Sequence, residues 1–253
     1  MYELEGLEQK DYNINQKLLI KKLTHIANHD DSAHLVHIVM FEKDSYLIKE
    51  KQTVKGFYFI LDGKVKVFNT AANQKTQILK LATRGCIVGL SAFNSTHYGA
   101  SALAFNNVTA YFIAQSDFKN FLALHQDLSL LLIKTLAFKV RHYEIRQKHL
   151  SLFPATEKII DSLLLIANKF GTKTSKNIVI KHCVTRRDIS SFSGVSLENT
   201  IRTLSKLQKD KYITIAPGTI TIKNKEALVA NLRNYCCPNS HHQKGFCYIK
   251  IKL

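Results

Sequence analysis

Acidic residues are scarce in this chain of 253 residues: 19 Asp and Glu stand against 36 Lys and Arg, for a formal net charge of +17. A surplus of this sign is typical of proteins that bind nucleic acid, because neutralising phosphates releases counterions. A solvated basic surface without a partner would have the same composition. The charge therefore supports a nucleic-acid partner but does not by itself establish one.

Long apolar stretches and a leader segment are also missing. No run of about 18 apolar residues occurs, which argues against a membrane-spanning helix, and the N-terminus from Met1 to Asp11 is polar and acidic. Cysteine is sparse and irregularly spaced, which argues against a disulfide scaffold. The five cysteines are Cys86, Cys183, Cys236, Cys237 and Cys247. We expect a cytoplasmic protein without a membrane partner.

Catalytic motifs are absent as well. The chain has no P-loop, no glycine-rich dinucleotide motif, no nucleophile elbow and no HExxH. A cupin-like enzyme would need clustered histidines and carboxylates, and His34, His37 and His97 lack that spacing. The tail after residue 235 offers Cys and His ligands for zinc, but its adjacent pairs suit a tetrahedral site poorly. No enzyme, metal or cofactor is predicted.

Short strands dominate the first half of the chain. Gly56–Leu61 and Lys64–Phe68 flank Asp62-Gly63, which is a strong hairpin signal. Further strand-like runs continue to Ile113, and a helix is expected over residues 13–29. Many short strands at this spacing predict a β-roll or jelly-roll barrel over residues 1–115.

A long helix is predicted over residues 116–150, and its apolar side chains fall on two stripes. The first stripe steps by three and four residues and predicts a homodimer interface. It comprises Leu128, Leu131, Thr135, Phe138, His142 and Ile145, and it continues to His149 and Leu152. The second is expected to pack on the chain's own domain and comprises Leu132, Leu136, Val140 and Tyr143. One wide stripe packed inside the monomer is the alternative. Protonation of His142 and His149 could loosen the seam.

Two short amphipathic helices and a hairpin follow between residues 185 and 222, after a helix over 155–170. Thr185 and Asp188 have the spacing of a helix N-cap, Gly194 suits a left-handed helix end, and Ser196 begins the second helix. Pro217-Gly218 is a turn signal between two β-branched triplets. This layout is typical of a winged helix-turn-helix, which places one helix in the DNA major groove.

The whole order resembles the Crp/Fnr family of bacterial transcription regulators over about residues 15–230. The matching landmarks are Phe57–Val67, Gly85–Gly89, Thr185–Ile189, Gly194–Asn199 and Arg202–Leu204. The resemblance implies an α+β fold with an N-terminal β-roll/jelly-roll (cyclic-nucleotide-binding-like) sensor domain over residues 1–115. A dimerisation helix over 116–150, a C-terminal winged helix-turn-helix domain over 151–235 and a tail of unknown role over 236–253 follow.

The resemblance also implies a set of DNA contacts. They are Thr185, Arg186, Ser196, Leu197, Glu198, Asn199, Arg202 and Lys206. Glu198 matches a glutamate that can accept from a cytosine amino group, and Arg202 an arginine that binds guanine or phosphate. Leu197 replaces an arginine common in the family and could touch a thymine methyl. Two protomers imply a near-palindromic site with recognition helices about 34 Å apart, and RNA polymerase as a further partner.

The sensor half departs from the family pattern of cyclic-nucleotide binders. Gly89 is followed by Leu90 instead of Glu, and Tyr98-Gly99 stands near the expected Arg-Ser pair. A buried cyclic phosphate would lack a charged partner, so no response to cyclic AMP is expected and the effector is unknown. The candidate effector pocket comprises Gly89, Leu90, Ser91, Tyr98 and Gly99. A DNA-coating protein without sequence preference is the competing reading, and Glu198 argues against it because a carboxylate repels phosphates.

Overall fold

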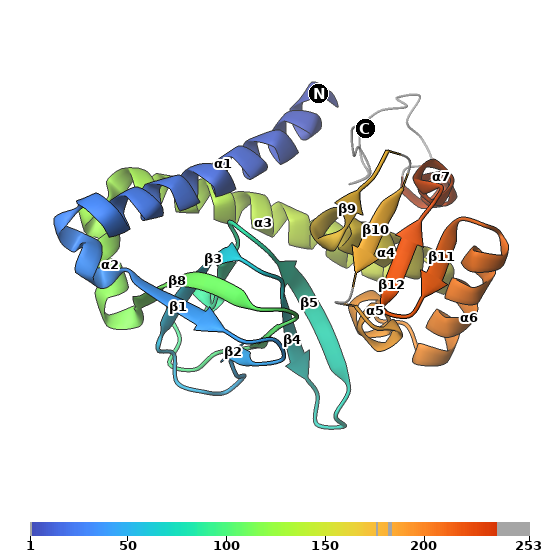
Figure 1. Ribbon diagram of the computed structural model, residues 1–253, viewed down its shortest axis with the longest axis horizontal. Helices are drawn as coiled ribbons and strands as arrows, with labels where there is room; N and C mark the ends of the chain where they lie inside the picture. The colour runs from blue at the N-terminus through green and yellow to red at the C-terminus, as the bar shows by residue number, and fades with distance from the viewer. Residues whose placement is uncertain (1, 176, 182–183, 237–253) are drawn as a thin grey trace. The chain divides into compact units, whose positions relative to one another are not determined.

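The computed structural model describes residues 2–175, 177–181 and 184–236 (Figure 1). Two compact units are present: residues 7–142 form a sensor unit, and residues 143–253 with the first six residues form a winged unit. They divide between His142 and Tyr143, inside a helix that continues to Leu152. The predicted α+β architecture is confirmed.

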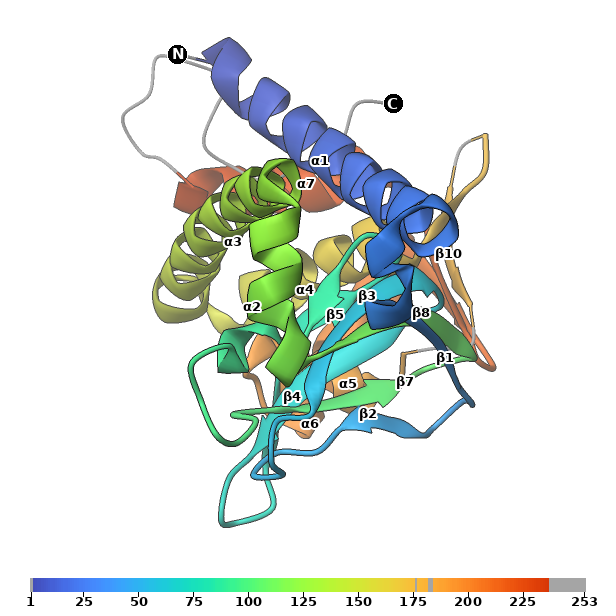
Figure 2. The same ribbon diagram turned by 90° about the vertical axis from the view of Figure 1, so that its left-hand side faces the viewer.

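The sensor unit contains two four-stranded antiparallel sheets, with strand orders β1-β8-β3-β6 and β2-β7-β4-β5 (Figures 1 and 2). The strands are β1 His37–Phe41, β2 Tyr46–Ile48, β3 Gly56–Asp62, β4 Val65–Thr70, β5 Thr76–Ala82, β6 Ile87–Val88, β7 Ser101–Ala104 and β8 Val108–Ala114. Short 3-10 turns lie at η1 Asp31–Leu35 and η2 Leu90–Ala92. The predicted β-roll is present.

The predicted hairpin at Asp62-Gly63 is wrong. β3 pairs with β6 and β8, whereas β4 pairs with β5 and β7, so the chain changes sheets at this turn. Gly63 has φ +100°, and a Cβ there would lie 2.6 Å from the Asn107 carbonyl oxygen. Glycine is needed because the backbone turns a corner against a neighbouring loop. A turn signal in the sequence indicates that the chain changes direction, but it does not indicate which strands will pair.

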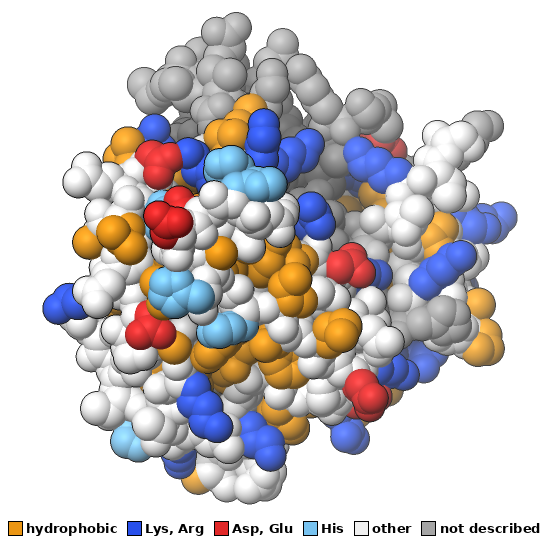
Figure 3. All heavy atoms as spheres, turned by 60° about the vertical axis from the view of Figure 1, so that its left-hand side comes forward, with side chains coloured by type: hydrophobic (Ala, Val, Ile, Leu, Met, Phe, Trp, Pro, Cys, Tyr) orange, Lys and Arg blue, Asp and Glu red, His pale blue; other side chains and the backbone are white. Residues whose placement is uncertain are grey.

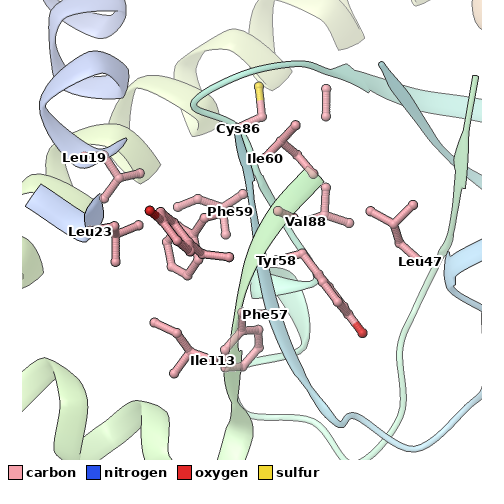
Figure 4. Close-up of a cluster of buried hydrophobic side chains, with 14 of the residues drawn as sticks. Leu19, Leu23, Leu47, Phe57, Tyr58, Phe59, Ile60, Cys86, Val88 and Ile113 are labelled. Carbon is pink, nitrogen blue, oxygen red and sulfur yellow. The ribbon is translucent and has the colours of Figure 1, made fainter. Parts of the chain in front are cut away.

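Strand β3 is buried on both faces, which explains its nearly continuous apolar sequence. Figure 4 shows Phe59 directed toward Leu19 and Leu23, while Tyr58 lies on the side of Leu47. On the helix side the rings of Phe57 and Phe118 have centroids 4.6 Å apart. Alternate side chains of one strand therefore join the helix layer and the second sheet into one core.

Three helices accompany these sheets: α1 Tyr2–His29, α2 Gln115–Leu124 and α3 Gln126–Leu152. The single helix expected over residues 116–150 is therefore broken, and α2 and α3 meet at 111°. His125 leaves the helical conformation, and its Nε2 lies 2.8 Å from Ser32 Oγ. The Ser129 hydroxyl donates to the Leu122 and His125 carbonyls at 2.9 and 3.3 Å, which satisfies the end of α2. This compensation makes the bend possible.

Helix α1 begins at Tyr2 and not at residue 13, and it lies along α3. The Tyr12 ring stacks on Phe138 with centroids 4.2 Å apart, and Lys22 forms an ion pair with Asp127. The hydrogen bond from Lys22 holds the pKa of Asp127 below its usual value. Part of the predicted dimer seam is thereby covered by the chain's own first helix.

Burial along the two stripes of α3 differs from the prediction. From the predicted dimer seam, Leu128 and Thr135 are 0% exposed and Leu131 is buried, all within the sensor unit. Phe138, His142 and Ile145 are half-buried. In the stripe expected to face inward, Leu132 is buried, but Leu136, Val140 and Tyr143 are exposed. Helical spacing located both faces correctly, whereas α1 determined which of them is covered.

The outer surface of the sensor unit is partly apolar. Figure 3 shows hydrophobic side chains gathered near the middle of one face, beside histidine and acidic side chains. On β1, at a sheet edge, Ile38 and Met40 are 64% and 80% exposed.

Among the described residues no single helix is long and apolar enough to cross a membrane; α2 and α3 pass that test of length and composition only as a bent pair.

The winged unit follows the predicted order. Its elements are α4 Ala155–Phe170, β9 Thr172–Lys173, β10 Ile178–Lys181, α5 Arg186–Ser193, α6 Leu197–Lys209, β11 Ile213–Ala216, β12 Thr219–Ile222 and α7 Lys225–Cys236. Its sheet has the order β11-β12-β10-β9. No helix was predicted where α7 lies. Most of the cysteine- and histidine-containing tail lies outside the described residues.

Candidate nucleic-acid interface

Helix α5 begins with a reciprocal cap. The Thr185 hydroxyl oxygen accepts from the Asp188 backbone N–H at 3.1 Å, and Asp188 Oδ2 accepts from the Thr185 N–H at 3.0 Å and from its hydroxyl at 2.6 Å. The predicted N-cap is confirmed, and it satisfies two orphan donors of the helix. Because the Thr185 hydroxyl already donates to Asp188, a hydrogen bond from this hydroxyl to DNA would have to replace that bond.

The turn between α5 and α6 is held by short-range bonds. Gly194 has φ +67°, the left-handed conformation expected for it, and its N–H donates to the Ser190 carbonyl. The Ser190 hydroxyl in turn donates to the Val195 carbonyl at 2.7 Å. Ile189 and Phe192 are buried beneath this turn. The angle between the two helices is therefore determined by local chemistry together with a small apolar core.

Helix α6 has an inner and an outer face. Ser196 caps its start by accepting from the Asn199 N–H at 3.3 Å, and the inner face buries Thr200, Leu204 and Leu207. The predicted DNA contacts of both helices are all exposed: Thr185, Arg186, Ser196, Leu197, Glu198, Asn199, Arg202 and Lys206. Ile201, which sequence reasoning left out, is also exposed on this helix. Sequence reasoning did not assign Ile201 to the outer face, because the buried inner face of this helix is also apolar.

Glu198 and Arg202 pair with each other on the outer face. Arg202 Nη2 donates to Glu198 Oε1 at 2.6 Å, and the two side chains are 81% and 73% exposed for Glu198 and Arg202. Exposed ion pairs at this spacing contribute about 0.3–0.5 kcal/mol, so base edges can displace this one at little cost.

The hairpin after α6 forms as predicted. β11 and β12 pair antiparallel from Ile213 opposite Ile222 to Ala216 opposite Thr219, across Pro217-Gly218. β12 also pairs with β10, which joins the hairpin to a strand lying before α5 in the sequence. The wing is thus anchored by a sheet and by the buried side chains of Ile213 and Ile220.

Comparison with known proteins agrees with both halves. Residues 38–125 match the family model of the cyclic nucleotide-binding domain, and residues 157–230 match that of the Crp-like helix-turn-helix domain. The chain belongs to the Crp/Fnr family of transcription regulators.

Individual relatives of this Crp/Fnr chain are distant. The transcriptional activatory protein AadR of Rhodopseudomonas palustris is 23% identical, over 81% of this chain and 86% of its own length. A CRP-like cAMP-activated global transcriptional regulator of Mycobacterium tuberculosis is 22% identical, over 77% of this chain and 88% of its own. The structure of FixK2 from Bradyrhizobium japonicum matches with a TM-score of 0.64 and 20% identity, covering 77% and 96% of the two chains. That structural likeness speaks for the fold.

A buried polar network supports the helix-turn-helix of this Crp/Fnr chain, and sequence reasoning missed it. Arg146 of α3 forms an ion pair with Asp161 of α4, and its Nη2 donates to the Ser162 hydroxyl at 2.9 Å and to the Phe192 carbonyl at 2.6 Å. The guanidinium also lies 4.5 Å from the Phe192 ring centroid. One side chain therefore joins the end of α3 to α4 and to α5, within the winged unit.

His149 belongs to this network and not to a helix seam. It is buried, its Nδ1 lies 3.3 Å from Asp161 Oδ1, and its ring stacks on Phe153 with centroids 4.3 Å apart. The prediction that His149 lies in the dimer seam, where its protonation could loosen that seam, is therefore wrong. The sequence did not indicate this network, because it does not reveal that the buried carboxylate of Asp161 lies opposite Arg146 and His149.

Among the predicted effector-pocket residues, Tyr98 is hydrogen-bonded to the protein backbone. The Tyr98 hydroxyl donates to the Gly56 carbonyl at 2.7 Å and accepts from the Lys55 and Gly56 N–H groups at 3.2 Å. A Cβ on Gly89 would lie 3.3 Å from the Tyr98 ring. Tyr98 is buried and Leu90 is half-buried, whereas Ser91 and Gly99 are exposed. The Tyr98 side chain therefore fastens the segment before β7 to the start of β3.

Two further groups in the sensor unit are packed into its core. Cys86 is 6% exposed, and its sulfur accepts from Gln16 Nε2 at 3.3 Å, which favours a packing role over a reactive thiol. Burial, assisted by Tyr98, raises the pKa of Tyr58 to about 12. Among residues 2–175, 177–181 and 184–236 no group of three His, Cys, Asp or Glu side chains could hold a metal ion.

Proposed function

We propose that this Crp/Fnr regulator is a cytoplasmic, non-enzymatic homodimer that binds a near-palindromic DNA sequence and acts on RNA polymerase. The observation that carries the proposal is the outer face of α6. Every predicted contact on it is exposed, while Thr200, Leu204 and Leu207 anchor the opposite face. A helix held in this way by caps and core can enter the major groove as a rigid body.

Homodimerisation is supported by the exposed row of α3. Ile133, Leu136, Val140 and Tyr143 are 62%, 40%, 58% and 46% exposed, and they step by three, four and three residues. Ile133 and Val140 would occupy heptad position a, and Leu136 position d. β-Branched residues at a with Leu at d favour a parallel coiled coil of two helices. Lys139 and Glu144 flank the row with opposite charges, as pairs that cross such an interface do. We therefore assign the dimer interface to this row instead of the Leu128 stripe.

Replacing Val140 by Lys tests the interface. The side chain is exposed in the single chain, so the variant should fold, but a charge in the seam should convert the dimer to a monomer in sedimentation experiments. Lys134→Ala, at an exposed position of α3 outside the row, should stay dimeric. A Val140→Lys protein that still sediments as a dimer would remove this row from the interface.

Selection of bound duplexes from a random pool tests DNA recognition. A near-palindromic motif is expected, with affinity that falls steeply as salt rises. Arg202→Ala should weaken binding to the selected motif by about 1–3 kcal/mol, more than it weakens binding to unrelated duplexes. Equal affinity for all duplexes would instead identify a DNA-coating module without sequence preference.

We also propose that cyclic AMP is not the effector. Where the family pattern of nucleotide binders has Glu and Arg-Ser, this chain has Leu90 and Tyr98-Gly99, and the Tyr98 hydroxyl is engaged by backbone groups. A cyclic phosphate brought to this place would lose water without gaining a cation from these positions. Titration calorimetry of the whole protein with cyclic AMP should show no heat of binding. Tight binding would overturn this part of the proposal without affecting DNA recognition.

A further inference from the structure

Helix α6 carries an apolar row beside its charged one. Leu197 and Ile201, one turn apart, are 37% and 42% exposed. Glu198 and Arg202, also one turn apart, form the ion pair next to them. Leu204 and Leu207 already supply the helix's inner contacts and are buried. The two outer apolar side chains therefore add an apolar strip to the edge of the surface proposed to meet DNA.

Such a strip discriminates between base pairs. The major groove offers donors, acceptors and one apolar group, the thymine 5-methyl. Leu and Ile side chains pressed against a donor or acceptor would remove its water without replacing the hydrogen bond, which is unfavourable. Against a methyl group they bury apolar surface on both sides. The strip thus favours thymine through attraction and disfavours the other bases through desolvation.

We infer that Leu197 and Ile201 read thymine methyl groups in each half-site, next to the base pair read by Glu198 and Arg202. This inference rests on the proposed function and makes Ile201 a specificity-determining residue. The predicted operator half-site has thymines adjacent to the position where the Glu198–Arg202 pair makes its polar contacts.

Removing single methyl groups tests the inference. In the duplex selected from a random pool, each thymidine is replaced in turn by deoxyuridine, which lacks only the 5-methyl, and binding of the full-length protein is followed by fluorescence anisotropy. At the contacted thymines the wild type should bind on the order of fourfold more weakly, the value expected for one buried methyl. At other thymines the replacement should have no effect.

Variants assign the effect to the two side chains. Ile201→Ala should bind the thymidine and deoxyuridine duplexes equally at one position, and Leu197→Ala at the other. Ile201→Val, which keeps a branched apolar group, should retain part of the discrimination. Arg202→Ala is the matched control on the same helix: it should bind more weakly and yet still distinguish thymidine from deoxyuridine.

The outcomes separate this inference from the proposed function. If a motif is enriched but its half-sites lack thymine, or deoxyuridine is tolerated throughout, the methyl reading is overturned and sequence-specific binding stands. Discrimination that persists in both alanine variants also overturns it. If no motif is enriched, the proposed function itself fails.

Discussion

The two halves of the molecule are stabilised by different means. In the sensor unit, β3 lies between a second sheet and a helix layer, and its core consists of aromatic and aliphatic side chains. In the winged unit a small apolar core is joined by a buried charge network of Arg146, His149 and Asp161. Tyr98 in the sensor unit is buried, whereas the outer face of α6 in the winged unit is exposed. Buried side chains therefore stabilise the sensor unit mainly by apolar packing. In the winged unit the buried charges also fix how α3, α4 and α5 are oriented.

The largest effect should come from breaking the charge network. Asp161→Ala leaves the Arg146 guanidinium without its carboxylate in a buried place, which should lower the free energy of unfolding by about 3–5 kcal/mol. Urea denaturation followed by circular dichroism measures this, and Lys148→Ala, exposed on α3, is the control. The double variant Arg146→Met with Asp161→Leu should recover most of the loss. A loss below about 1 kcal/mol for Asp161→Ala would show that the network is dispensable.

A smaller effect is expected from the hydroxyl at the centre of the sensor unit. Tyr98→Phe leaves the Gly56 carbonyl and two N–H groups without this partner, which should cost about 1–3 kcal/mol. Tyr46→Phe removes a hydroxyl from a 42% exposed side chain and should be nearly neutral. Equal stability of the two variants in urea would mean that water replaces the Tyr98 hydroxyl.

Loss of the α5 cap should have an intermediate effect confined to the winged unit. Thr185→Ala removes the acceptor for the Asp188 N–H and should cost about 1 kcal/mol. Thr185→Ser keeps the hydroxyl and should behave like the wild type. Hydrogen exchange of the α5 amides would show the change, and equal exchange in the alanine and serine variants would contradict the cap's contribution.

The smallest effect is a pH dependence of the sensor unit. The pKa of Tyr58 is raised from 10.0 to about 12, so below the lower value both folded and unfolded chains hold the proton. As pH rises through this window the unfolded chain releases it first, and the stabilisation is lost. Between about pH 9 and about pH 11 the wild type should lose more stability in urea than Tyr58→Phe. Equal losses would place Tyr58 in a more polar environment.

Features set by neighbours along the chain were predictable. Thr185 and Asp188, Ser196 and the left-handed Gly194 lie within a few residues of their partners, so their bonds follow from spacing. The exposed outer face of α6 followed from the helical period. Ile201 was missed because residue type alone does not show whether an isoleucine is exposed or buried.

Features set by distant partners were not predictable. The Phe192 carbonyl that Arg146 binds is 46 residues away, and the network's carboxylate is 15 residues away. The turn at Asp62-Gly63 indicated a change of direction, but the partners of β3 and β4 come from other parts of the chain. Similarly, the α2–α3 bend depends on Ser32 and Ser129, which no periodicity at His125 indicates.

By itself the sequence determined the order of the elements, the helix-turn-helix with its caps, the polar outer face of α6 and the family. These depend on dihedral preferences and hydrogen bonds between residues a turn or two apart, which residue types and spacing encode. Only the tertiary structure decided which stripe of α3 is covered by α1, where β3 finds its neighbours and what lies beside Tyr98 and Arg146. Those outcomes depend on contacts between segments far apart in the chain, and periodicity specifies a face without specifying its partner.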